Sequence, residues 1–290
     1  MAKKTPNHPD QLDIFEVEES RSLLGKLFAD SRLYTTREGY KELLEFATKL
    51  RNFAPFNAML LQVQKPGLAY AASAHEWQVS FNRKPKEGAR PLLILWPFGP
   101  VALVYDLEDT EGDAVPEDAH IFTAEGLMTQ ERLQSMFKKL NKFIDVYPID
   151  AGSRAAGGIR RTYWAKNDAE YSRYRLNYNK NHPPAVQFAT LAHELGHLFL
   201  GHLGPDKKLR VSDRSSGLPH ASEEIEAESV AYLVCARNNV SPNSDSYLSD
   251  YLKDDKPLEH IDIYHIMSAA GRVESHLGLT INTDFGIAGK

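Results

Sequence analysis

The sequence predicts an α+β fold in two parts, on three observations. Hydrophobic residues make up 42% of the 290 residues and charged residues 25%, which is typical of a globular protein with a buried core. Some segments repeat apolar residues at helical spacing, whereas others alternate or run as short apolar stretches, as strands do. The strongly acidic segment 106–113 separates an earlier group of such elements from a later one. We expect this segment to be a solvated loop beside a domain boundary.

The earlier group is expected to contain two helices and a hairpin. Apolar residues at spacings of three and four predict a helix over 37–52. A second helix follows Pro55, with Asn57 as its expected N-cap. Two apolar runs, 92–96 and 101–105, are separated by proline and glycine and therefore predict a β-hairpin.

The later group is expected to mix strands with longer helices. The same patterns predict a helix over 128–143, strands over 144–148, 160–165 and 174–178, a helix over 183–203, and further helices to about residue 277. Together with the charge pattern, these elements predict a polar tail (1–20), a smaller α+β N-terminal domain (21–122), a larger domain (123–280) and a second tail (281–290).

Composition excludes several classes of protein. The single cysteine, Cys235, excludes a disulfide framework within the chain and a zinc site built from several cysteines. No run of 18 apolar residues occurs, and no apolar segment follows the two lysines at the start, so we expect a cytoplasmic protein without a membrane partner. A net charge of -5 argues against attraction of the whole protein to nucleic acid, although it does not exclude a local basic patch.

The helix over 183–203 carries the clearest chemical motif, His193-Glu194-Leu195-Gly196-His197. Histidines four residues apart lie one turn apart on the same helix face, so both imidazoles can bind one metal ion. Glu194 lies beside them, where it can take a proton from a metal-bound water. Two structural histidines would give the same pattern, but an apolar helix preceded by a strand and followed by an acidic helix favours a metal site.

A third ligand is expected on the acidic helix that begins near Ser222, its expected N-cap. The stripe of small apolar residues on this helix places Glu223 and Glu224 on the buried side, with Glu226 and Glu228 beside it. Spacing alone does not decide which glutamate binds the metal. It also allows all four to serve only as favourable charges near a helix N-terminus.

The residues around both motifs resemble two related groups, the ImmA/IrrE metallopeptidases and the antirestriction ArdC-like proteins. Segment 188–197 looks like their shared active-site helix, and 224–228 looks like their second motif. The resemblance implies a zincin-like metalloprotease domain, with a small sheet packed on the active-site helix and one Zn²⁺ per chain. It also implies Glu224 as third ligand and Glu228 as an acid that orients a ligand histidine, with Glu226 as the alternative ligand.

The upstream region is similar to the N-terminal, single-stranded-DNA-binding module of ArdC-like proteins, most clearly at 54–61 and 86–91. Cations for phosphates and aromatic rings for bases are what single-strand binding requires. A charged hairpin loop beside a core tryptophan would have the same composition. The candidate contacts are Lys65, Trp77, Arg83, Lys84, Lys86 and Arg90.

These observations favour a zinc-dependent endopeptidase that cleaves a protein partner, in a regulatory or mobile-element setting. Glu194 is the expected general base, and His220, Tyr178 and Tyr174 are candidates to stabilise the developing oxyanion. The strand at 174–178 could pair with an extended peptide substrate. The alternative is a single-stranded-DNA-binding protein of the antirestriction type, whose zinc domain is structural or latent.

Overall fold

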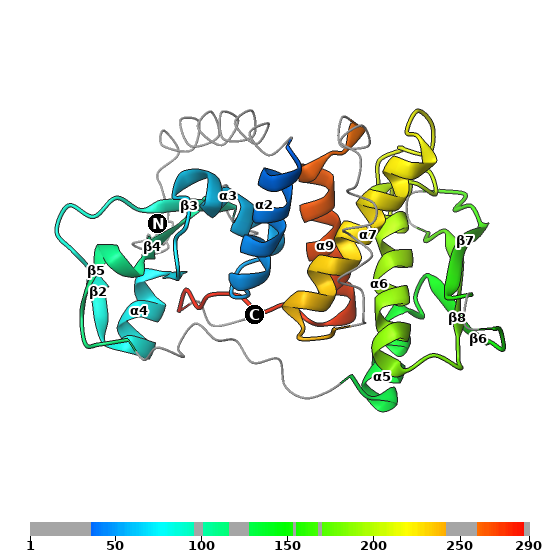
Figure 1. Ribbon diagram of the computed structural model, residues 1–290, viewed down its shortest axis with the longest axis horizontal. Coiled ribbons are helices and arrows are strands. Elements are labelled where there is room, and N and C mark those ends of the chain that lie inside the picture. Colours follow the sequence, from blue (N-terminus) through cyan, green and yellow to red (C-terminus); the bar gives the residue numbers. More distant parts are fainter. Residues whose placement is uncertain are drawn as a thin grey trace, which may run out of the picture. The chain divides into compact units, whose positions relative to one another are not determined.

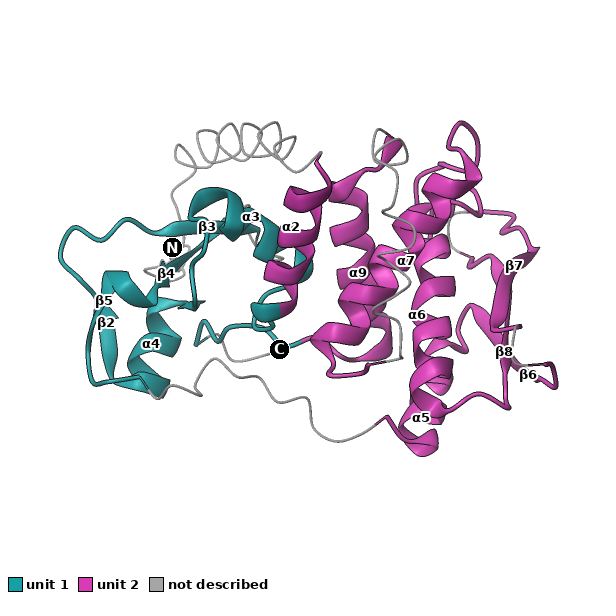
Figure 2. Cartoon of the chain, in the orientation of Figure 1, with its two compact units in different colours: residues 1–33, 49–122, 281–290 teal, residues 34–48, 123–280 magenta. Residues whose placement is uncertain are grey.

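The computed structural model describes residues 36–95, 101–115, 128–152, 155–167, 170–241 and 260–286. Helices and three small sheets make up the described chain, which confirms the predicted α+β class (Figure 1). Two compact units are present (Figure 2). The first holds the described residues within 49–122 and 281–290, and the second holds those within 34–48 and 123–280. Residues 36–48 are therefore grouped with the later elements, and 281–286 with the earlier ones.

The first unit contains two helices and two small sheets. The helices are α3 (Pro55–Gln64) and α4 (Ala74–Phe81). One sheet has the strand order β1 (Ala71–Ala72), β4 (Val101–Asp106), β3 (Leu92–Leu95). The other sheet pairs β2 (Arg83–Pro85) with β5 (Thr110–Gly112). Strands β3 and β4 are antiparallel, which confirms the predicted hairpin. Residues 96–100, which include the expected end of its first strand and its turn, lie outside the described residues.

Two local expectations in this unit are wrong. Asn57 lies inside α3, whose N-cap is Ala54, and its side chain instead bonds both the N–H and the C=O of Leu95, at the edge of β3. The acidic segment is not a loop, because Asp106 ends β4, a 3-10 turn follows over Leu107–Asp109, and β5 then pairs with β2. Asp106 is buried against Lys65, so part of the charge that suggested a solvated loop is neutralised inside the fold.

The sheet of the second unit has β8 at its centre. Strand β8 (Arg173–Asn179) pairs in parallel with β6 (Ile144–Ile149) and antiparallel with β7 (Gly157–Tyr163). Alternate residues of β8, Tyr174, Leu176 and Tyr178, are buried, as expected for a sheet with one face on a hydrophobic core. The predicted small sheet beside the motif helix is therefore present.

Five described helices accompany this sheet in the second unit: α2 (Arg37–Lys49), α5 (Gln130–Leu140), α6 (Pro184–Leu200), α7 (His220–Arg237) and α9 (Ile263–Leu277). Helix α6 packs against both β7 and β8. It ends at Gly201, whose φ of 87° is the left-handed conformation that glycine adopts without steric cost. Helix α7 starts at His220, so the expected N-cap Ser222 lies inside it and is buried.

A close crossing of α6 and α7 brings the two sequence motifs together. A Cβ at Gly196 would lie 3.3 Å from the backbone of Ala227, so glycine permits the helices to approach here. Helix α9 is joined to α7 by a buried ion pair, with 2.8 Å between Arg237 Nε and Glu274 Oε1. None of the described helices is long and apolar enough to cross a bilayer.

Candidate metal centre

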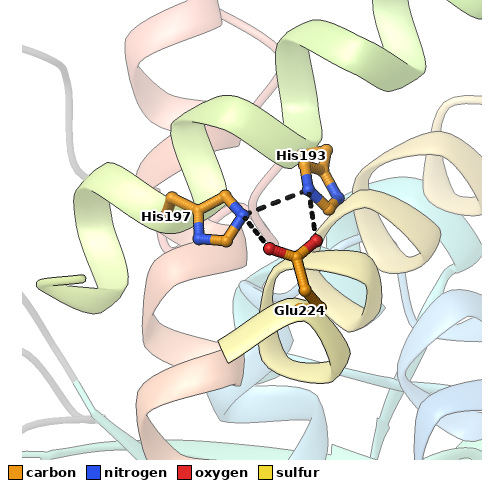
Figure 3. A group of neighbouring side chains, drawn as sticks. All are labelled: His193, His197 and Glu224. Atoms are coloured by element: carbon orange, nitrogen blue, oxygen red, sulfur yellow. Dashed lines mark hydrogen bonds and ion pairs between the residues drawn. The ribbon is translucent and has the colours of Figure 1, made fainter. Parts of the chain in front are cut away.

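Three side chains converge where α6 crosses α7 (Figure 3). His193 and His197 lie one turn apart on α6 and present their Nε2 atoms 3.1 Å from each other. Glu224, from the first turns of α7, places Oε2 3.5 Å from His193 Nε2 and Oε1 3.4 Å from His197 Nε2. All three side chains are largely but not completely buried.

The spacing of these atoms fits a tetrahedral metal ion. Metal–ligand bonds of about 2.0–2.1 Å place neighbouring tetrahedral ligands about 3.3 Å apart. The three observed separations, 3.1, 3.4 and 3.5 Å, lie close to that value. Two imidazoles and one carboxylate form a donor set suited to zinc and similar transition-metal ions, with a fourth position left for water.

The electrostatics of the chain also favour a cation at this point. Burial lowers the pKa of His193, but hydrogen bonds to Glu224 and Glu228 outweigh it, so the pKa of this imidazole is raised. Burial and the nearby charge of His193 lower the pKa of His197. The carboxylates therefore stabilise one positive charge between the helices, which a metal ion can supply in place of a proton.

Glu194 lies next to the histidine pair and contacts strand β7 of the sheet. Its carboxylate accepts a hydrogen bond from the backbone N–H of Ile159 on β7. Burial raises the pKa of this carboxyl above its usual range. A buried glutamate with a raised pKa is suited to accepting and returning a proton near neutral pH.

Glu228 lies one turn after Glu224 on the same face of α7 and contacts His193 from the side opposite the cluster. The distance from Glu228 Oε2 to His193 Nδ1 is 3.2 Å. If His193 binds a metal through Nε2, its Nδ1–H donates to this carboxylate. That contact would orient the imidazole and increase its basicity.

Glu226, the alternative ligand, faces another direction. It is fully buried, and both of its oxygens accept hydrogen bonds from Arg214, at 2.8 and 2.7 Å. Burial tends to raise the pKa of Glu226, but hydrogen bonds from His202 and Arg214 hold it below the usual range. Glu226 is therefore engaged by neighbouring cations and donors and does not belong to the converging group.

His202 was not among the site residues predicted from the sequence. His202 follows the glycine that ends α6, and its Nδ1 lies 2.9 Å from Nδ1 of His197. The available signal was a histidine five residues after the motif, in the turn that reverses the chain. Only the folded turn shows that this histidine contacts a candidate ligand.

The structure brings one of the three oxyanion candidates to the cluster. The exposed His220, at the start of α7, has Nδ1 3.7 Å from Glu224 Oε1. Tyr174 is buried and donates its hydroxyl to Asp206 at 2.9 Å. Tyr178 is buried with its ring centroid 4.8 Å from that of Phe137 on α5. These two tyrosines hold the core of the sheet.

The strand expected to receive a peptide is the wrong one. Both edges of β8, which contains 174–178, are already paired, with β6 and with β7. Within the described sheet, β7 is an edge strand, and it packs directly on α6. Its pairing order could not be read from the sequence, in which β7 and β8 have similar patterns.

The candidate nucleic-acid contacts of the first unit are mostly engaged within that unit. Trp77 is fully buried among Tyr70 and Phe81, so its ring presents no face on which a base could stack. Lys65 is ion-paired with Asp106, Glu108 and Asp109, and Lys84 with Glu111. Arg83 donates hydrogen bonds to Thr110 and to the backbone carbonyl of Asp113. Lys86 donates to the backbone carbonyl of Glu108. Arg90 is exposed.

A comparison with known protein families finds a match over the segment that contains the candidate metal ligands. Residues 155–236, which contain both motifs, match the sequence model of the IrrE N-terminal-like domain, Peptidase_M78. This match confirms the ImmA/IrrE-type resemblance over that segment. No protein with a curated description matches the chain.

Two solved structures are similar to the chain, and both are crystal structures of the antirestriction ArdC protein from the R388 plasmid. The Mn(II)-bound structure has 19% identity and a TM-score of 0.36, covering 77% of this chain and 82% of that one. The metal-free structure has 20% identity and a TM-score of 0.33 over the same coverage.

Proposed function

We propose that this protein is a zinc-dependent endopeptidase. The observation that carries the proposal is the convergence of His193, His197 and Glu224, whose ligand atoms lie within 4.8 Å of one another beside Glu194. The match of residues 155–236 to a peptidase family supports it. One Zn²⁺ per chain would be held by these three side chains.

The bound ion would supply Lewis acidity, polarising a carbonyl and lowering the pKa of a water molecule. Glu194 accepts the proton of the attacking water and later delivers it to the leaving amine. The raised pKa of this buried carboxyl suits both steps, since it makes Glu194 a stronger proton acceptor than an exposed glutamate and lets it hold the proton between them. The hydrogen bond from Ile159 N–H holds the carboxylate beside the histidine pair.

The substrate is an extended segment of a protein partner, which adds to the edge of β7. Peptides that add to a sheet edge are bound mainly through backbone hydrogen bonds. Pairing therefore positions the scissile bond without requiring a particular amino-acid sequence in the substrate. The contact between Ile159 and Glu194 places the middle of β7 next to the proposed general base. His220, exposed and close to Glu224, is the group we assign to the developing oxyanion.

The proposal is tested by measuring the metal content of purified protein. Wild type is expected to contain about one zinc per chain, and His193→Ala and Glu224→Ala are expected to lose it. Glu223→Gln is the matched control, because Glu223 is the preceding glutamate of α7 but does not belong to the group. Wild type that binds no zinc after purification without chelators would refute the proposal.

The alternative, a single-stranded-DNA-binding protein, receives less support from the first unit because Trp77 is buried and two of the five candidate cations, Lys65 and Lys84, are paired with acids. It is tested by titrating a fluorescent single-stranded oligonucleotide at several salt concentrations. Binding that weakens with salt, and weakens further in Lys84→Gln with Lys86→Gln, would favour this alternative. We expect neither effect.

A further inference from the structure

A buried chain of polar side chains leads away from one candidate ligand. His197 Nδ1 lies 2.9 Å from His202 Nδ1, and His202 Nε2 lies 3.0 Å from Glu226 Oε2. Each carboxylate oxygen of Glu226 in turn accepts a hydrogen bond from the Arg214 guanidinium. The side chain of His202 is 3% exposed and that of Glu226 is not exposed at all. We refer to His202, Glu226 and Arg214 as the outer triad.

The directions of these hydrogen bonds follow from the proposed metal site. If His197 binds an ion through Nε2, its proton is on Nδ1, which must donate to Nδ1 of His202. The proton of His202 is then on Nε2 and donates to Glu226 Oε2. Arginine can only donate, so Glu226 accepts at both oxygens. Each donor along this row of hydrogen bonds, from His197 to Glu226, therefore meets an acceptor. Metal binding by His197 selects one tautomer of each histidine.

The outer triad also joins segments that are far apart in the chain. Glu226 Oε1 accepts a hydrogen bond of 2.9 Å from the backbone N–H of Asp262. Asp262 is the N-cap of α9, where its side chain accepts from the N–H of His265. A single carboxylate on α7 thus connects the turn after α6, the loop at Arg214 and the start of α9.

Stability alone is a poor explanation for this arrangement. Burying an ion pair carries a desolvation cost that its mutual attraction often only balances, and apolar residues of similar volume can be as stabilising. The Glu226–Arg214 ion pair is linked to the candidate ligand His197 through His202. It is better explained as a fixed hydrogen-bond acceptor at the end of this chain of side chains. Hydrogen bonds behind a metal ligand orient its ring and raise its basicity.

We propose that the outer triad positions the metal centre: it holds His197 with Nε2 directed at the ion and connects metal binding to the N-terminus of α9. The inference rests on the proposed metal site. His202, Glu226 and Arg214 are positioning residues, since they act through His197.

Two variants of His202 separate hydrogen bonding from packing. The side chain of His202→Asn places an oxygen near the former Nδ1, where it can still accept from His197. The side chain of His202→Gln can reach Glu226 but leaves the Nδ1–H of His197 without its acceptor. Zinc affinity, measured by competition with a chromophoric chelator, is expected to fall 10- to 100-fold in His202→Gln and to recover in large part in His202→Asn.

A double-mutant cycle distinguishes the two sides of the site. Glu228→Gln acts on His193 through a separate contact, so its loss of zinc affinity should multiply with that of His202→Gln. The melting temperature of each metal-free variant shows whether it remains folded. Losses that do not multiply would contradict an action of His202 through His197 alone.

Hydrogen exchange provides a second readout, at a distance from the ligands. Zinc is expected to slow exchange of the Asp262 N–H in wild type and to have much less effect in His202→Gln. Wild-type zinc affinity in His202→Gln, or equal loss in the Asn and Gln variants, would overturn the inference while the proposed function stands. Wild type that binds no zinc would overturn both.

Discussion

Zinc is expected to stabilise the second unit, and the size of the effect follows from how the site is built. The ligands come from two helices, α6 and α7, and converge only when these cross at Gly196. The unfolded chain lacks this arrangement, so the ion binds mainly the native state. At a free zinc concentration 100 times the Kd, the free energy of unfolding should rise by about 2.7 kcal/mol.

This energy converts into a measurable shift in melting temperature. For a folding unit of roughly 150–250 residues, 1 kcal/mol corresponds to about 2–4 °C, so the transition of the second unit should rise by about 5–11 °C. The assay is thermal unfolding of chelator-treated protein with and without zinc, with magnesium as the control ion. Magnesium prefers oxygen ligands and should have no comparable effect.

Matched variants decide whether the proposed site produces the shift. His193→Ala should abolish it, because one of three ligands is removed, and Glu223→Gln should retain it. An equal shift in wild type and His193→Ala would contradict the proposed site, since zinc would then bind elsewhere. The absence of any shift in wild type would also refute it.

Three further predictions concern the base, a buried ion pair and the edge strand. Glu194→Gln should keep zinc and lose about 10²- to 10⁴-fold in kcat/KM on any peptide that wild type cleaves, and equal rates would exclude Glu194 as the base. Arg237→Met should lower the free energy of unfolding by about 3–5 kcal/mol in urea titrations, because it removes the guanidinium that is paired with the buried carboxylate of Glu274. A second substitution, Glu274→Met, should restore much of that loss, and no recovery would show that the charge is not the cause. Gly157→Val should displace β7, because a Cβ there would overlap the carbonyl of Asn177, and peptide cleavage should fall more than zinc affinity does. Equal losses in cleavage and affinity would argue against β7 as the substrate strand.

Local features of the chain could be predicted well because they depend on neighbours in sequence. The histidine pair is fixed by the geometry of a single helix, in which positions four apart share a face. The hairpin of β3 and β4 and the strands of the second unit follow from short apolar patterns bounded by turn residues. The α+β class follows from the same patterns.

The choice among the glutamates of α7 depended on tertiary structure. Glu224 and Glu228 face α6, whereas Glu226 faces Arg214 and His202, yet all three lie within two turns of one helix. The apolar stripe did not identify Glu226 as buried, because a carboxylate can be buried when charged partners surround it. Those partners come from a loop and a turn that folding brings to the helix.

The sequence alone also could not predict roles that depend on strand pairing or on side-chain burial. The strand over 174–178 looked suitable for a substrate, but it lies at the centre of the described sheet with both of its edges paired. Trp77 looked suitable for stacking a base, but it fills a core. The amino-acid order was enough to show which groups with metal-binding chemistry are present and which helix holds two of them. Which of these groups meet depends on the folded chain, because strand order, helix facing and burial arise from contacts between residues far apart in the sequence.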